Sequence, residues 1–139
     1  MVTTAREIMS SDVTCLREED SVMAAARKMA QLGVGALPIC GSDNRVRGML
    51  TDRDIVIRVL AEGQDPQTVK TGELAQGEVV TIGVGDDASE ILRTMKDHQV
   101  RRLPVIDGHE LVGIVAVADV ARALPDRAVG ELVEAISVP

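Results

Sequence analysis

The chain contains an internal repeat, and this repeat constrains the fold more than any other feature of the sequence. Sliding the sequence along itself places residues 33–39 (GVGALPI) on residues 99–105 (QVRRLPV). After a one-residue gap near residue 43, Gly48 falls on Gly113 and Asp54 falls on Asp119. Similar sequences fold alike, so the chain is predicted to contain two structurally equivalent units.

Each copy has the pattern of a β-α-β-β-α unit. Short apolar segments predict strands at residues 13–16, 36–40 and 46–50, and again at 79–82, 103–106 and 111–115. Capping residues and helical spacing predict helices that start at Asp20-Ser21, Asp87, Asp52 and Val117. The second helix of each unit should end at Gly63 or Pro125, and Thr4 to Glu7 has the spacing of a capping box.

The predicted fold class is α/β (α+β). The first and second strands of each unit should be parallel, with a right-handed crossover. A three-stranded sheet with two helices cannot bury both of its faces, so the two repeats are expected to pack face to face about a pseudo-twofold axis. The predicted organisation is repeat 1 at 1–62, a linker at 63–72, repeat 2 at 73–125 and a C-terminal helical tail at 126–139.

The composition excludes several functions. The 139 residues include no Phe, Tyr or Trp, and the net charge is −7. Without aromatic rings there is no platform for stacked bases, and an acidic chain lacks the basic face that phosphate backbones require. No apolar run approaches the length of a membrane span, and the first residues lack a signal-peptide pattern. We therefore expect a cytoplasmic protein without nucleic-acid or membrane partners.

Cys15 and Cys40 allow two interpretations. They end two strands that should be neighbours, so a disulfide could join them and would stabilise the fold by about 3 kcal/mol. Cytoplasmic thiols are normally reduced, and the alternative is two small buried hydrophobic side chains. His98 and His109 form no ligand cluster with the cysteines by spacing, so no metal site is predicted.

Two motifs, placed in register by the repeat, carry a family resemblance. One is the strand ending Leu-Pro-Ile or Leu-Pro-Val, and the other is Gly-x-x-Thr-x-x-Asp at Gly48 to Asp54. Over about residues 4–125 the chain resembles a tandem pair of CBS domains, also called a Bateman module. The resemblance implies a non-enzymatic regulatory module, commonly a homodimer, which binds an adenosine nucleotide of the AMP, ADP or ATP class between its repeats. It further implies a stress response and an unidentified protein partner.

The first copy carries the residues that such a site needs. Thr51 and Asp54 stand where a strand passes into a helix, and a helix N-terminus favours phosphate. A hydroxyl can donate to a phosphate oxygen and a carboxylate can accept from ribose hydroxyls. The resemblance thus assigns Thr51 to phosphate and Asp54 to ribose, with Arg53 beside them. Alternatively, these residues only cap a helix.

The second copy departs from the motif. It keeps Asp119 but has Ala116 in place of the hydroxyl residue. It also has Arg101 and Arg102 before its Leu-Pro strand, and the resemblance implies that these arginines reach a phosphate held by the other repeat. One competent nucleotide site is expected, with a weak second site at Asp119.

A second hypothesis is a structural or redox-responsive stress protein with a Cys15–Cys40 disulfide and degenerate nucleotide sites. The missing hydroxyl at Ala116 and the cysteine pair favour it, whereas the intact Thr51 and Asp54 oppose it. No nucleophile–base pair or metal cluster is evident in the sequence, so an enzyme is not predicted.

Overall fold

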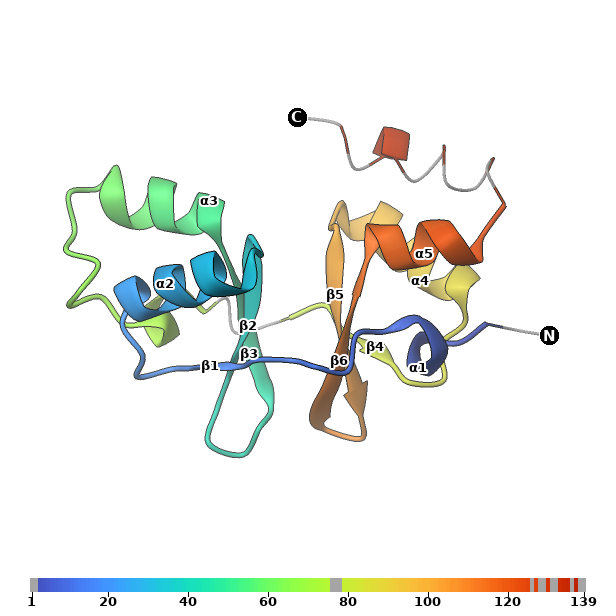
Figure 1. Cartoon of the computed structure of the whole chain (residues 1–139), viewed down its shortest axis with the longest axis horizontal. Coiled ribbons are helices and arrows are strands. Elements are labelled where there is room, and N and C mark those ends of the chain that lie inside the picture. Colours follow the sequence, from blue (N-terminus) through green and yellow to red (C-terminus); the bar gives the residue numbers. More distant parts are fainter. Residues whose placement is uncertain are drawn as a thin grey trace. The chain divides into compact units, whose positions relative to one another are not determined.

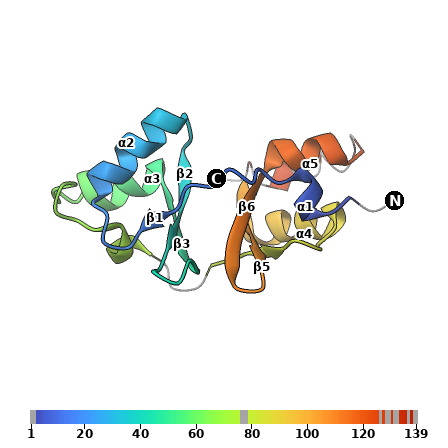
Figure 2. The same ribbon diagram turned by 60° about the horizontal axis from the view of Figure 1, so that its bottom comes forward.

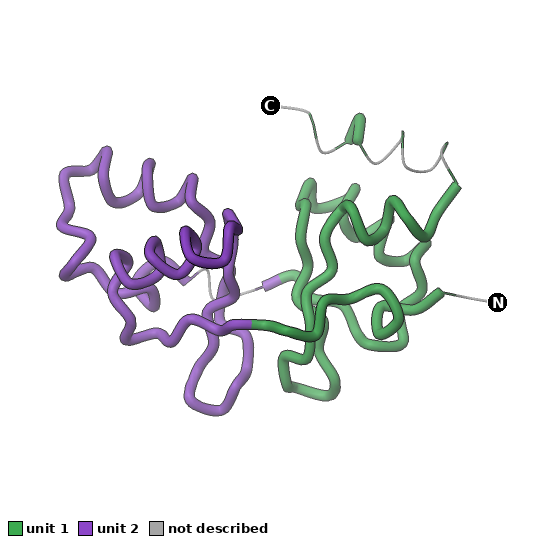
Figure 3. Tube along the Cα trace, in the orientation of Figure 1, with its two compact units in different colours: residues 1–13, 80–139 green, residues 14–79 purple. Residues whose placement is uncertain are grey.

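The fold is taken from a computed structural model, which describes residues 3–75, 79–125, 127, 130, 133–135 and 137. The chain divides into two compact units (Figure 3). Unit 2 is residues 14–79, and unit 1 combines residues 1–13 with residues 80–139. The described part of the predicted tail 126–139 is limited to six residues, and the rest of that prediction lies outside the described residues.

Unit 2 contains the first repeat. Its elements are β1 (Leu16–Arg17), α2 (Val22–Leu32), β2 (Ala36–Cys40), β3 (Val46–Thr51), α3 (Asp52–Asp54), the π-helix η1 (Ile55–Leu60) and the 3-10 helix η2 (Thr71–Leu74). β1 pairs with β2 in parallel, and β2 pairs with β3 in antiparallel. Helices α2 and α3 lie on the same side of this sheet (Figures 1 and 2).

Unit 1 contains the second repeat with the same element order. Its elements are α1 (Ala5–Ile8), β4 (Ile82–Gly83), α4 (Ala88–His98), β5 (Arg102–Asp107), β6 (Glu110–Ala116) and α5 (Val117–Ala123). The strands again pair as one parallel and one antiparallel ladder, in the order β4-β5-β6. The predicted mixed α/β fold, with one three-stranded sheet per repeat, is confirmed.

Capping residues start the long helices where the sequence predicts. The Ser21 hydroxyl accepts the Ala24 N–H at 3.0 Å, and the Asp87 carboxylate accepts the Glu90 N–H at 2.9 Å. Three details differ from prediction. Thr4 precedes α1 as expected, but its hydroxyl donates to the Glu7 carboxylate at 3.3 Å and caps no backbone N–H. The first strand of each repeat is shorter and begins later, at Leu16 and Ile82. The helix predicted from Asp52 also widens to a π-helix, because the Ala61 N–H bonds the carbonyl five residues back, at Val56.

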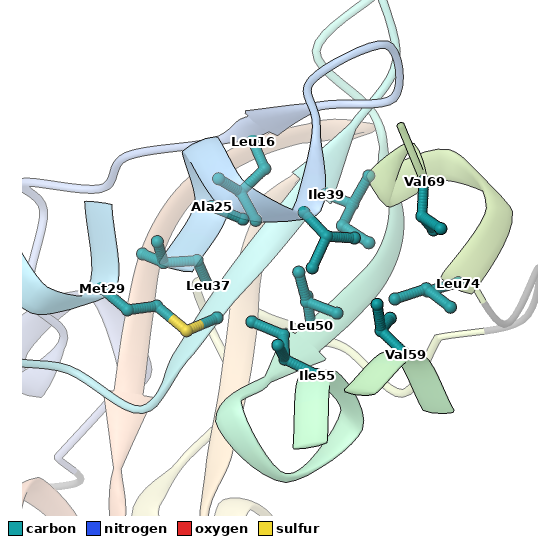
Figure 4. Close-up of a cluster of buried hydrophobic side chains, with 11 residues drawn as sticks. Leu16, Ala25, Met29, Leu37, Ile39, Leu50, Ile55, Val59, Val69 and Leu74 are labelled. Carbon is teal, nitrogen blue, oxygen red and sulfur yellow. The ribbon is translucent and has the colours of Figure 1, made fainter. Parts of the chain in front are cut away.

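Among the described residues, the main hydrophobic cluster of unit 2 consists of aliphatic side chains and methionine. Figure 4 shows this cluster, to which helix η1 contributes Val59 and its first residue, Ile55. Met29 from α2 packs into the same cluster. Leu16, Ile39 and Leu50 are almost completely buried, so the strands supply the centre of the core. Close packing of branched side chains takes the place of the aromatic area found in most cores.

The segment before each repeat packs into the unit of the other repeat. In unit 1, the Ala5 N–H bonds the Asp86 carbonyl at 2.8 Å, and the Ala88 N–H bonds the Thr3 carbonyl at 2.9 Å. Unit 2 has the equivalent bonds. The Thr71 N–H bonds the Asp20 carbonyl at 2.8 Å, and the Val22 N–H bonds the Val69 carbonyl at 2.9 Å.

These equivalent bonds fix the starts of α4 and α2. The predicted linker 63–72 therefore ends in a buried, hydrogen-bonded segment, with Thr71 fully buried.

Candidate functional site

Thr51 and Asp54 form a reciprocal cap at the junction of β3 and α3. The Thr51 hydroxyl accepts the Asp54 N–H at 3.1 Å, and the Asp54 carboxylate accepts the Thr51 N–H at 3.0 Å. Both residues are only half-buried. The cap arises because a β-region residue at the strand end leaves the first helical N–H groups without partners within the helix.

The cap leaves ligand-binding capacity at both side chains. A hydroxyl that accepts one hydrogen bond still has its proton to donate, and Asp54 uses only Oδ2 in the cap. Thr51 can therefore donate to an anionic oxygen, while Oδ1 of Asp54 can accept from a hydroxyl. The structural and the ligand-binding interpretations of these residues are compatible.

Asp52 adds a second carboxylate at the same helix start, and sequence reasoning gave it no role. Its Oδ1 accepts the Arg53 N–H at 2.8 Å, and its own N–H bonds the Gly35 carbonyl at 2.9 Å. Arg53 is exposed. The first N–H groups of the helix are thus already paired with oxygens of the chain, and a bound anion would lie near two carboxylates. The Asp-x-Asp spacing is the sequence signal for this arrangement.

The second repeat has a different arrangement at the same position. The Ala116 N–H donates to Asp119 Oδ2 at 2.8 Å, and Arg122 Nη2 donates to Asp119 Oδ1 at 2.6 Å. Both carboxylate oxygens of Asp119 are therefore engaged, and no hydroxyl stands at the strand end. The contribution of Arg122 was not foreseen, although its position three residues after an acid on a helix is a known pairing distance.

A cavity of about 370 Å³ borders this second position within unit 1. It is lined by residues of α1 and its flank and of α5, namely Thr3, Glu7, Ile8, Asp119, Arg122 and Ala123. The Asp119 carboxylate lines this cavity, but it is already paired with the Arg122 guanidinium. A ligand that uses Asp119 Oδ1 would share this oxygen with Arg122 or displace it.

Arg101 and Arg102 lie at the junction of β5, β6 and α5 in their own repeat. The Arg101 carbonyl accepts the Val117 N–H at 3.0 Å, and Arg102 pairs in register with Ala116. Arg101 is exposed and Arg102 is half-buried. Their binding to a phosphate held by Thr51 stays a prediction.

Cys15 and Cys40 are joined by a disulfide. Their Cα atoms are 5.8 Å apart, within the usual range for such bonds. Cys40 ends β2 and is fully buried, whereas Cys15 precedes β1 and is half-buried. Of the two interpretations that the sequence left open, the structure has the covalent one.

Charged side chains surround the hairpin that follows Cys40. Arg47 pairs with Asp43 at 3.2 Å and with Glu18 at 3.5 Å, and Arg17 donates to the Gly41 carbonyl at 3.0 Å. The hydrogen bond from the Arg45 N–H is the main influence that holds the pKa of Asp43 below its ordinary value, and the Arg47 guanidinium acts in the same direction. Desolvation of the carboxylate is the second-largest influence on this pKa and acts in the opposite direction, so the net lowering depends on the hydrogen bond and the nearby guanidinium together.

His98 and His109 are exposed, one at the end of α4 and one in the β5–β6 turn. Among the residues that the structure describes, no three His, Cys, Asp or Glu side chains converge as a metal site. None of the helices within the described ranges has the length and apolar character needed to cross a membrane.

Comparison with protein families identifies the repeats. The model of the CBS domain matches residues 5–61 and 72–126. Hypoxic response protein 1 of Mycobacterium tuberculosis is 51% identical over 138 residues, which cover 99% of this chain and 96% of that protein.

Solved structures give the same result. The crystal structure of Hypoxic Response Protein I with two coordinated zinc ions is 54% identical, with a TM-score of 0.83 over 88% of this chain and 100% of that one. The CBS domain pair of protein MJ0100, in complex with 5′-methylthioadenosine and S-adenosyl-L-methionine, has a TM-score of 0.78 over 88% of this chain and 96% of that one. At 23% identity, the second likeness shows the fold alone. The zinc ions belong to the structure of that relative.

Proposed function

Because the chain belongs to the CBS-domain family and carries two copies of the domain, we propose that it is a non-enzymatic regulatory module that binds an adenosine nucleotide at Thr51 and Asp54. The observation that carries the proposal is the free hydrogen-bonding capacity of these two side chains at an accessible helix start. A related fold that holds two adenosine-containing ligands supports the same ligand class. The module acts in the cytoplasm as a homodimer and passes its state to a protein partner, in a stress response.

The two repeats are unequal in this proposal. The Thr51 hydroxyl retains its proton and Asp54 retains an oxygen that accepts no hydrogen bond in the cap. Both oxygens of Asp119 already accept a hydrogen bond, and Ala116 has no hydroxyl. A ligand can shift the protein between states only if it binds them with different affinity. Binding through a few polar anchors and aliphatic contacts should be modest, which suits a sensor.

Calorimetry of the full chain with AMP, ADP, ATP and S-adenosylmethionine tests the proposal. We expect heat with at least one of them, its loss in Asp54→Ala, and its retention in the matched Asp119→Ala. The absence of heat with every ligand at millimolar concentration would contradict the proposal. Equal losses in both variants would contradict the inequality of the repeats.

The carboxylates of Asp52 and Asp54 predict an order among these ligands. Each additional phosphate brings more negative charge towards the helix start, so ATP requires neutralisation by arginine more than AMP does. We therefore propose that Arg101→Ala with Arg102→Ala weakens ATP binding more than AMP binding. An equal effect on the binding of both ligands would contradict the proposal that the two arginines bind phosphate.

The disulfide favours a second candidate function, a structural or redox-responsive stress protein. The bond joins the segment before β1 to the buried end of β2. In this alternative, reduction changes the stability of unit 2 and the nucleotide site is vestigial. A partner that binds the oxidised chain more tightly than the reduced chain, with no effect of nucleotide, would favour the alternative.

A further inference from the structure

The cavity of about 370 Å³ in unit 1 borders a position where the two repeats carry different side chains. The repeat alignment places Arg58 of η1 at Ala123 of α5. It also places Leu74 of η2 at Ile8 of α1. In unit 2, Arg58 Nη1 donates to the Leu74 carbonyl at 3.1 Å and so bridges η1 and η2. Ala123 has no donor, and both it and Ile8 line the cavity, so the second repeat has open space where the first repeat has a guanidinium.

The segments that border this position are held in the same way in both units. The Ala88 N–H bonds the Thr3 carbonyl, and the Val22 N–H bonds the equivalent Val69 carbonyl, both at 2.9 Å. The difference between the units therefore lies in the side chains. Val69 is buried in the hydrophobic cluster of unit 2, whereas Thr3 is half-buried and lines the cavity. The cavity is thus a property of the second repeat and is not required by the fold.

The charges around the cavity favour a cationic ligand. Its lining includes two carboxylates, Glu7 and Asp119, and one guanidinium, Arg122. Arg122 Nη2 donates to Asp119 Oδ1 at 2.6 Å, so these two charges largely balance each other. Glu7 accepts the Thr4 hydroxyl at 3.3 Å, and no cation within the described ranges forms an ion pair with it. A cation in the cavity would therefore meet a carboxylate whose charge is not neutralised, and an anion would be repelled by it.

We propose that this cavity binds a small organic cation with a guanidinium group, which takes the place that Arg58 has in the first repeat. The guanidinium donates to the Ile8 carbonyl, the counterpart of the Leu74 carbonyl, and to the Glu7 carboxylate. A planar guanidinium suits two such acceptors because its donors form a fixed fork, whereas an ammonium is a point charge. A volume of about 370 Å³ lies within the range of small-molecule sites. The proposal goes beyond the proposed function, since every lining residue belongs to unit 1 and no nucleotide takes part.

Calorimetry of the full, oxidised chain with agmatine, in the absence of nucleotide, tests the proposal. Agmatine carries a guanidinium at one end of an alkyl chain and an ammonium at the other, and putrescine has an ammonium at both ends. We expect one agmatine per chain, bound at least about tenfold more tightly than putrescine. No binding of agmatine up to about 10 mM, or equal affinity for the two compounds, would overturn the proposal. Because no nucleotide is present, these outcomes are independent of whether the adenosine site exists.

Variants of the lining locate the site. Ala123→Arg restores the residue of the first repeat and fills the cavity with the chain's own guanidinium, so it should abolish agmatine binding. The matched Ala118→Arg adds the same charge to the exposed side of α5, outside the cavity lining, and should bind agmatine as the wild type does. Glu7→Gln should weaken binding at least about tenfold, and circular dichroism confirms that each variant is folded. Unchanged binding in Ala123→Arg or in Glu7→Gln, or an equal loss in Ala118→Arg, would overturn the proposal.

The reciprocal change in the first repeat gives an independent readout. Arg58→Ala removes the bridge to the Leu74 carbonyl and should open the equivalent space in unit 2. Agmatine at a saturating concentration should then raise the thermal midpoint of this variant more than that of the wild type, because it replaces the missing guanidinium in the folded state. An equal rise in both proteins would contradict the equivalence of the two positions, on which the proposal rests.

Discussion

Thr51 and Asp54 bond each other twice, side chain to backbone in both directions, at 3.1 and 3.0 Å. The equivalent pair in the second repeat, Ala116 and Asp119, retains only one of these bonds, at 2.8 Å. The missing hydroxyl therefore changes local stability as well as ligand chemistry. This difference gives a prediction with opposite signs in the two repeats.

Thr51→Ala should lower the free energy of unfolding by about 1 kcal/mol, because the Asp54 N–H loses its acceptor. Ala116→Thr should raise it by up to about 1 kcal/mol, because the Asp119 N–H gains a cap. Urea denaturation of both variants measures the two changes. The same sign in both variants would show that the cap is not what distinguishes the repeats.

Loss of the disulfide should destabilise the chain by about 3 kcal/mol, since the bond closes a loop between residues 25 apart in sequence. The variant is Cys15→Ala with Cys40→Ala, compared with the wild-type chain in oxidising and reducing buffer. Reduction should lower the wild-type midpoint towards that of the variant and leave the variant unchanged. Thiol titration of the denatured, unreduced wild type should find no free thiol, and two free thiols would contradict the bond.

Gly72→Ala should destabilise unit 2 by about 1–3 kcal/mol, as overpacking does. A Cβ at this position would lie 2.9 Å from the Glu18 carbonyl oxygen, the acceptor of the Gly72 N–H. Backbone on both sides must move to relieve the contact. Gly85→Ala is the matched control, because a Cβ there meets nothing within 4 Å. Hydrogen exchange at Thr71 and Gly72 should rise in the first variant alone.

The Asp43 carboxyl should titrate below its ordinary pKa of 3.8, mainly because the Arg45 N–H bonds its ionised form. A lowered pKa means that this contribution to stability is complete above the unfolded value and is lost as the pH falls through the folded value. NMR titration of the carboxyl carbon measures this pKa. The Arg45 amide signal should shift in the same pH range, and Asp43→Asn should abolish that shift. A carboxyl that titrates at or above 3.8 would contradict the turn geometry.

The sequence by itself determined the repeat, the order of strands and helices and most helix starts. Ser21 and Asp87 cap where they were predicted because a cap depends on residues only three apart. The Leu-Pro strands were equally predictable, since β-branched and apolar segments of five or six residues suit a buried strand. These features are local, and local sequence carries their physical cause.

Only the tertiary structure decided the long-range partners. The bonds of Ala5 to Asp86 and of Thr71 to Asp20 join backbone groups, which carry no sequence signature. The hydrogen bond from Arg122 to Asp119 depends on the side-chain rotamer of the arginine. The disulfide between Cys15 and Cys40 depends on how closely β1 and the end of β2 approach each other. The π-helix at 55–60 was likewise not predicted, because the spacing of its apolar residues fits an α-helix as well. The pattern of side chains along the sequence thus determined the helices and strands. Backbone geometry and packing determined which distant groups form hydrogen bonds, ion pairs and the disulfide.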